Sequence, residues 1–150
     1  GLGAPYWRSD IRGQISGITR DTSKADIAMA ALKSICFQTR DLFECLLNDT
    51  NFTREKFVIR VDGGMTRNNM MMQFLSDILQ VKIERPANQE STAIGAAYLA
   101  GIFAGIYKDV ADVEKLWKTD RIFEPKISID HADQFYDGWK KTIERLISNG

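Results

Sequence analysis

Phe57-Val58-Ile59-Arg60-Val61 runs directly into Asp62-Gly63-Gly64, and a helical pattern opens near Asn68. The first segment is apolar apart from one arginine and mostly β-branched, which predicts a largely buried, central strand. The two glycines lack the Cβ atoms that would block the close approach of a ligand. The helix that follows presents N–H groups and the positive end of its dipole, which suits a phosphate group. Glycines also serve a tight strand-to-helix turn, so the pattern leaves a purely structural turn equally open.

Strand and helix patterns alternate on both sides of this stretch. The predicted helices cover about Lys24–Leu47, Asn68–Leu79, Thr92–Gly105 and His131–Ser148. Short strands are predicted at Gly13–Thr19 and at Val81–Glu84, the second of them stopped by Pro86. This order predicts an α/β fold, a layered sheet with packed helices and a right-handed crossover. The segment from about 110 to 125 has no clear pattern.

Two local features refine the predicted helices. Ser23 is the expected N-cap of the first helix, with Asp26 three residues later in a capping-box arrangement. Small residues in Thr92–Gly105 predict close packing beside the central strand, so that Ala97→Leu or Ala100→Leu should cost about 1–3 kcal/mol.

Length and charge place broad limits on the protein. The 150 residues, 44% hydrophobic and 27% charged, predict a single folded domain over 1–150. Twenty basic side chains balance twenty acidic ones, which makes nucleic acid a poor candidate partner. No apolar run approaches the roughly 18 residues of a membrane helix.

Cys36 and Cys45 are expected on opposite faces of one helix, roughly 13.5 Å apart along its axis, and therefore unpaired. Unpaired cysteines fit a reducing compartment, so we expect the protein in the cytoplasm.

Other chemistry-bearing residues favour structural interpretations. His131 is expected at a solvated capping position, and Met70-Met71-Met72 as core filler with one exposed member. The charge run Asp112, Glu114, Lys115 and Lys118 is typical of a solvated helix face. One histidine and two separated cysteines offer no metal-ligand spacing. We therefore expect no metal site within the chain and no catalytic set built on its single histidine.

Several segments of the sequence resemble those of the FGGY carbohydrate kinases, in the same order and over essentially the whole chain. The blocks that carry the resemblance are Gly1–Trp7, Arg12–Arg20, Phe37–Asp41, Val61–Gly64 with Asn68-Asn69, Met72–Phe74, Ser76–Leu79, Glu84–Pro86, Thr92–Gly101 and Gly138–Lys141. The first and third blocks resemble the glycerol-specific members more than those that use xylulose or ribulose.

The resemblance implies an actin-like, ribonuclease H-like fold in which two domains clamp ATP, Mg²⁺ and a polyol. The chain resembles the later part of the second, carboxy-terminal domain. By position, Gly64 matches the glycine whose backbone contacts the nucleotide phosphates, and Gly63 completes that loop. Asn68 matches an asparagine that lines the nucleotide site. The resemblance places the catalytic aspartate, the polyol-binding residues and the amino-terminal phosphate loop before Gly1.

The function that the resemblance implies is transfer of the ATP γ-phosphoryl group to a terminal hydroxyl of glycerol. The expected cofactors are ATP and Mg²⁺, and the expected partners are glycerol and further copies of the same chain. Two alternatives stay open. One is a non-catalytic, actin-like interaction module in which Gly63-Gly64 is only a turn. The other is a kinase of the same family acting on another polyol or a ketose.

Overall fold

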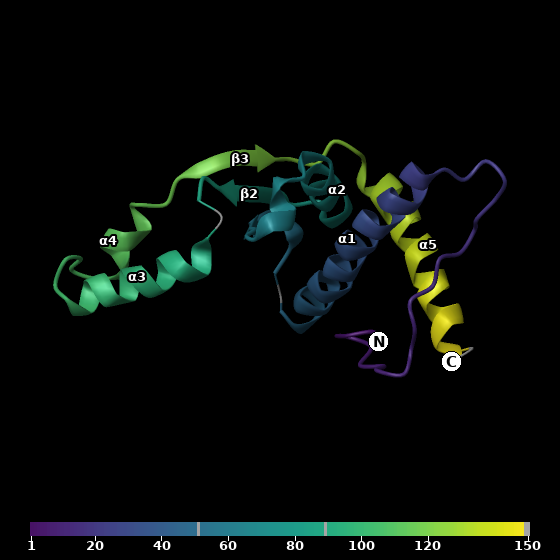
Figure 1. Ribbon diagram of the computed structural model, residues 1–150, viewed down its shortest axis with the longest axis horizontal. Helices are drawn as coiled ribbons and strands as arrows, with labels where there is room; N and C mark the ends of the chain where they lie inside the picture. Colours follow the sequence, from purple (N-terminus) through teal and green to yellow (C-terminus); the bar gives the residue numbers. More distant parts are fainter. Residues whose placement is uncertain (51, 89, 149–150) are drawn as a thin grey trace.

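A small mixed sheet lies between two groups of helices in the computed structural model, which describes residues 1–50, 52–88 and 90–148 (Figure 1). Its strands in the described part are β1 (Val58–Arg60), β2 (Lys82–Pro86) and β3 (Thr119–Phe123), side by side in that order. β1 and β2 run parallel, whereas β3 is antiparallel to β2. Helix α2 (Asn69–Leu79) connects the parallel pair, as the predicted crossover requires.

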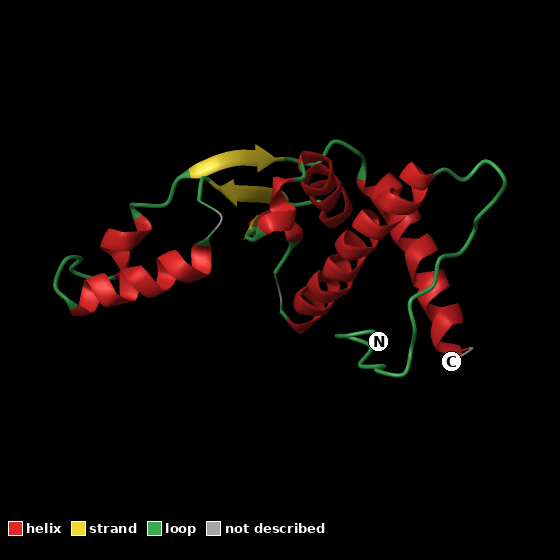
Figure 2. Ribbon diagram, in the orientation of Figure 1, coloured by secondary structure: helices red, strands yellow, loops and turns green. Residues whose placement is uncertain are grey.

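Helix α2 is the centre of the core. It contacts α1 (Lys24–Asp49), α5 (Ile129–Ser148), β2 and β3, and these helices gather at one end of the sheet (Figure 2). The buried apolar side chains of this cluster are Cys36, Phe43, Met71, Met72, Leu75, Ile78, Leu79, Val81, Ile83, Phe123 and Ala132. Met70 is 55% exposed, so the predicted division of the three methionines is confirmed.

The helix boundaries follow from local capping chemistry. The Ser23 hydroxyl accepts a hydrogen bond from the Asp26 N–H, and Asp26 accepts one from the Ser23 N–H, at 3.3 and 2.9 Å. This confirms the predicted capping box of α1. At the end of α2, Gln80 adopts a left-handed conformation that closes the helix.

Polar side chains fix α2 against the strand ends. The fully buried Ser76 hydroxyl lies 2.8 Å from the Val81 carbonyl oxygen and 3.1 Å from that of Phe123. Asp77 accepts hydrogen bonds from the Gln73 amide and the Lys126 N–H. These hydrogen bonds tie the later part of α2 to the end of the sheet where β2 begins and β3 ends.

A buried carboxylate joins α1 to α5. Asp41, 3% exposed, accepts hydrogen bonds from the Tyr136 hydroxyl at 2.6 Å and the Trp139 indole N–H at 2.9 Å. Burial, and then the hydrogen bond to Asp41, raise the pKa of Tyr136 above its ordinary value. The neighbouring Arg40 pairs with Glu44 and Asp133 and lies over the Tyr136 ring.

Two strand predictions were wrong. Residues 13–19 form an exposed loop rather than a strand, with Ile15 and Ile18 58% and 60% exposed. Alternation of side chains forms a strand only where a neighbouring strand supplies hydrogen-bond partners. β1 lies at the edge of the described sheet instead of its centre, and Val58 is 51% exposed. In addition, β2 includes Pro86 as its last residue instead of stopping before it.

The predicted packing of the third helix is also wrong. Helix α3 (Ser91–Phe103) and the short α4 (Val110–Glu114) stand away from the core as an outer arm, residues 91–114 (Figure 1). Ala97 and Ala100 are exposed, so leucine at either position would not overpack a contact between this helix and β1. α4 and β3 occupy the segment that had no clear sequence pattern.

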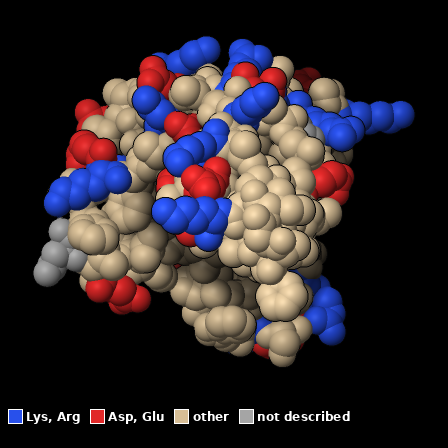
Figure 3. Space-filling view, turned by 90° about the vertical axis from the view of Figure 1, so that its left-hand side faces the viewer, with Lys and Arg blue, Asp and Glu red and all other residues tan. Residues whose placement is uncertain are grey.

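The arm carries apolar side chains on its surface. Leu99, Phe103, Ile106 and Val110 are 68–96% exposed. Figure 3 looks at this end of the molecule and shows a broad uncharged area beside intermingled basic and acidic side chains. Every helix in the described ranges is too short or too polar to cross a membrane.

The two cysteines are free, as predicted, and differ in burial, so their reactivity should differ. Cys36 is fully buried, and burial raises the pKa of its thiol to about 12, whereas Cys45 is half-buried. Because the thiolate is the reacting species, a thiol reagent should modify Cys45 well before Cys36. We expect one fast equivalent in the native chain and two in denaturant. The Cys45→Ser variant should lose the fast equivalent, and equal rates for both thiols would contradict this picture.

Candidate functional site

The candidate site is the loop of residues 62–68, here called the glycine loop. It follows β1 and continues through a 3₁₀ turn (Gly64–Arg67) into α2. Gly63 has φ +92°, which L side chains rarely adopt, and this position therefore requires glycine. The Thr66 N–H and hydroxyl both donate to the Gly63 carbonyl oxygen, at 3.0 and 2.7 Å. The loop is thus closed on itself by a buried threonine.

Open space lies in front of both glycines. A Cβ atom built on Gly63 or on Gly64 meets no heavy atom within 4 Å. Tight packing therefore does not explain the second glycine, and its φ lies outside the region that requires glycine. A surface of this kind lets a ligand approach the loop backbone directly.

Asn68 lies at the other end of the glycine loop, where it is the N-cap of α2. Its side-chain oxygen accepts hydrogen bonds from the N–H groups of Met70 and Met71, both at 3.1 Å. The sequence pattern predicted that the first N–H groups of this helix are free to bind a ligand. The Asn68 side chain already accepts two of them, so fewer are available than predicted. The structure brings Gly63, Gly64 and Asn68 together on one short loop at the carboxyl end of β1. Ligands of parallel α/β sheets bind at this edge.

A buried arginine that the sequence analysis did not single out holds the loop. Arg85 of β2 is 8% exposed, and its Nη1 donates to the Thr66 carbonyl oxygen at 2.7 Å and to Asn69 Oδ1 at 2.9 Å. Nothing in the sequence pattern separates Arg85 from Lys82 and Glu84, the other charged residues of β2. Such a residue is unusual in a buried position unless it is paired.

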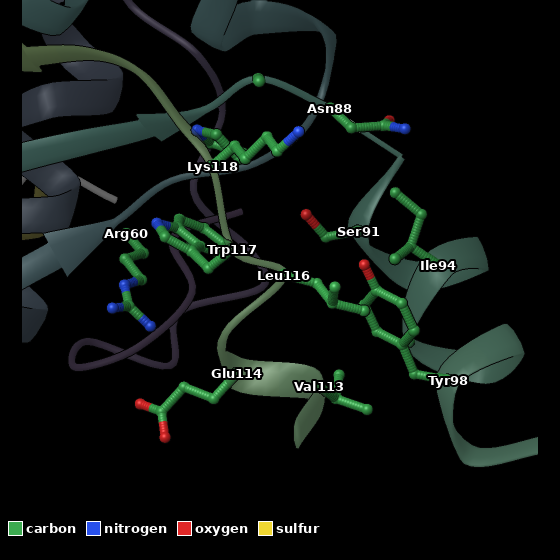
Figure 4. Close-up of a pocket in the computed structure, with 13 residues that line it drawn as sticks. Arg60, Asn88, Ser91, Ile94, Tyr98, Val113, Glu114, Leu116, Trp117 and Lys118 are labelled. Carbon is green, nitrogen blue, oxygen red and sulfur yellow. The ribbon is translucent and has the colours of Figure 1, made fainter. Parts of the chain in front are cut away.

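A cavity of about 440 Å³ lies beside the same sheet edge, between the strands and the outer arm (Figure 4). Leu116 and Trp117, just before β3, lie across from Tyr98 of α3, and Leu116 points toward the tyrosine. The Arg60 guanidinium lies 4.5 Å from the centre of the Trp117 ring. The sequence analysis missed this cavity because the segment that supplies Leu116 and Trp117 had no clear pattern. Its walls are mostly apolar and its rim is charged, which is typical of small-molecule sites.

The only histidine of the chain lies in the first turn of α5, as the sequence predicted. His131 is exposed and stacks on Phe135, with ring centres 4.8 Å apart. Outside residues 51, 89, 149 and 150, no three His, Cys, Asp or Glu side chains lie close enough together to hold a metal ion. We assign no residue of the chain to a metal.

A family model described as the C-terminal domain of the FGGY family of carbohydrate kinases matches residues 1–104. The chain belongs to this FGGY family. Curated relatives named glycerol kinase include one from Marinomonas sp. (strain MWYL1), 48% identical over 147 residues, which are 97% of this chain and 29% of the relative. Another, from Ectopseudomonas mendocina (strain ymp), is 47% identical over 150 residues, 100% of this chain and 30% of the relative. The FGGY chain thus spans about three-tenths of the length of the curated relatives it matches.

Solved structures of FGGY kinases match the fold. The crystal structure of Plasmodium falciparum glycerol kinase with ADP aligns with a TM-score of 0.86 and 38% identity, covering 97% of this chain and 29% of that one. Xylulose kinase from Lactobacillus acidophilus aligns with a TM-score of 0.76 and 23% identity, over 96% of this chain and 29% of that one. These matches confirm the expected α/β fold of the actin-like ATPase type.

Proposed function

We propose that this chain is the nucleotide-binding part of a glycerol kinase, which transfers the γ-phosphoryl group of ATP to glycerol. The observation that carries the proposal is the contrast between relatives. Curated glycerol kinases are 44–48% identical across essentially the whole chain and a solved one is 38% identical, whereas the solved xylulose and gluconate kinases are 23–24% identical. The contrast favours glycerol over a ketose as the substrate.

The proposed nucleotide site is the glycine loop, with Gly63, Gly64 and Asn68 as its binding residues. The nucleotide phosphates would lie in the open space in front of the two glycines, where backbone N–H groups stabilise negative charge. Catalysis of phosphoryl transfer rests almost entirely on positioning and charge stabilisation, and this loop would supply part of both. The 38% identity with a glycerol kinase solved with ADP supports the assignment, as does the position of the loop at the carboxyl end of β1.

The remaining parts of the proposal concern the longer protein. Residues 1–150 would form the later part of the second domain, and Mg²⁺ would arrive with ATP. The general base and the glycerol-binding residues would come from the share of the relatives that this chain does not span. We further propose a cytoplasmic homo-oligomer, since the two thiols are free and the family resemblance implies further copies.

Replacing Gly64 by valine in the full-length protein tests the site. The positive φ of the glycine loop belongs to Gly63, so Gly64 does not need a left-handed backbone conformation. Because a side chain at Gly64 points into open space, Gly64→Val should fold normally and obstruct only the ligand. We expect the KM for ATP to rise about 10-fold or more, with the KM for glycerol within about twofold of wild type.

The matched control is Gly138→Val, which adds the same side chain into open space on the distant helix α5. It should leave both KM values and kcat unchanged. If Gly64→Val leaves the KM for ATP and kcat at their wild-type values, the assignment of the glycine loop is wrong.

A further inference from the structure

The guanidinium of Arg85 connects three separate elements. Nη1 donates to the Thr66 carbonyl oxygen and to Asn69 Oδ1, so one nitrogen bridges the 3₁₀ turn and the first residue of α2. Nε and Nη2 both lie 2.7 Å from Asp120 Oδ2 on β3. These partners are separated from Arg85 by 19, 16 and 35 residues along the chain.

These hydrogen bonds hold the later part of the glycine loop and the residue directly after it. Within the loop, Arg85 binds the Thr66 carbonyl, and Thr66 in turn donates twice to the Gly63 carbonyl oxygen. Directly after the loop, Arg85 binds Asn69, the neighbour of Asn68. One side chain of β2 is therefore linked to Gly63 through Thr66 and to Asn68 through Asn69.

The chemistry of the contact requires an arginine. Its planar guanidinium offers donors in a fixed fork, which reach a carbonyl, an amide and a carboxylate at once. A lysine keeps the charge, but it has a single compact ammonium group in place of three nitrogens, so it cannot reach all three acceptors at once. Asp120 balances the buried charge, while its own side chain is 46% exposed.

We propose that Arg85 is a positioning residue for the nucleotide, with Asp120 as its counter-ion. Arg85 acts through the glycine loop and does not touch the ligand, because all three of its nitrogens bind acceptors of the protein. The inference rests on the proposed function, since it takes the glycine loop as the nucleotide site. It adds a residue outside that loop, on a different strand, that sets the affinity for ATP.

The test uses steady-state kinetics of the full-length protein carrying Arg85→Lys, with ATP and glycerol varied separately. Misplacing a binding group by about 1 Å can cost as much as ~100-fold in rate, so we expect kcat/KM for ATP to fall about 10-fold or more. The KM for glycerol should stay within about twofold of wild type. A purely structural role would lower the melting temperature and the fraction of active protein but would leave the KM for ATP unchanged.

Arg121→Lys is the matched control, because Arg121 lies directly opposite Arg85 in the β2–β3 register and is exposed. It should leave the KM for ATP unchanged. Asp120→Asn supplies a second, milder variant, whose exposed carboxylate is not needed for packing. It should raise the KM for ATP about threefold, through loss of a charge-assisted hydrogen bond to Arg85. If Arg85→Lys does not fold, Asp120→Asn decides, and an unchanged KM for ATP overturns the proposal.

The Gly64→Val result separates the two proposals. If Gly64→Val raises the KM for ATP and the Arg85 and Asp120 variants do not, the positioning role is wrong and the nucleotide site stands. If none of the variants changes the KM for ATP, the glycine loop is not the nucleotide site and both proposals fail.

Discussion

Incubated with glycerol and magnesium–ATP, the 150-residue chain alone is expected to release no ADP above background. The glycine loop presents backbone groups and one amide side chain, and we assign no general base or polyol-binding residue to the chain. Phosphoryl transfer depends on holding donor and acceptor in line, and one wall of a site cannot hold both. A coupled assay of carefully purified chain, with the full-length protein as positive control, measures this directly.

Nucleotide affinity of the chain alone should also be low. A few backbone hydrogen bonds must offset the translational and rotational freedom that the ligand loses, which leaves about −4 kcal/mol, a Kd in the millimolar range. Titration of the labelled chain with magnesium–ATP should shift NMR signals mainly between Asp62 and Asn69. Micromolar binding, or steady ADP release that depends on glycerol, would show that the active site lies elsewhere.

Replacing Asp41 by alanine is expected to have the largest effect on stability. The carboxylate accepts hydrogen bonds from the Tyr136 hydroxyl and the Trp139 indole, and all three groups lie between α1 and α5. Alanine leaves both donors without their acceptor, at a cost of about 1–3 kcal/mol each. The free energy of unfolding of Asp41→Ala, from urea titration, should therefore be about 4 kcal/mol below wild type.

Two variants control for this effect. Asp41→Asn keeps the shape and one acceptor oxygen, so it should cost clearly less than Asp41→Ala. Asp137→Ala removes an exposed carboxylate of α5, which pairs with Lys140, and should leave the free energy of unfolding close to that of wild type. A loss below about 1 kcal/mol for Asp41→Ala would mean that the contact contributes little.

Local chemistry made the helices predictable. The Ser23–Asp26 capping box depends on residues three positions apart, so the sequence displays it directly. The glycine loop was predictable for the same reason, since a strand, two glycines and a helix follow one another. The positive φ could be placed on Gly63 rather than Gly64 only from the backbone itself.

Features that depend on distant partners were not predictable. The apolar run of Phe57–Val61 predicted a central strand, but strand burial is decided by neighbours, and β1 has β2 on one side only within the described residues. Arg85 acquires its role from Thr66, Asn69 and Asp120, none of which is close to it in sequence. The small residues of α3 predicted a packed helix, yet Ala96, Ala97 and Ala100 are exposed, and the buried Gly101 packs against Tyr107 of the same arm.

The apolar arm has a practical consequence for handling this chain. Leu99 and Phe103 project from a helix whose surface carries little charge, and Ile106 extends the same apolar surface. Apolar surface of this kind promotes self-association in water, and the zero formal net charge of the chain supplies little mutual repulsion. Solubility, rather than folding, therefore sets the concentration at which the isolated chain can be handled. Adding acidic residues to the exposed face of α3 is the rational way to raise that concentration.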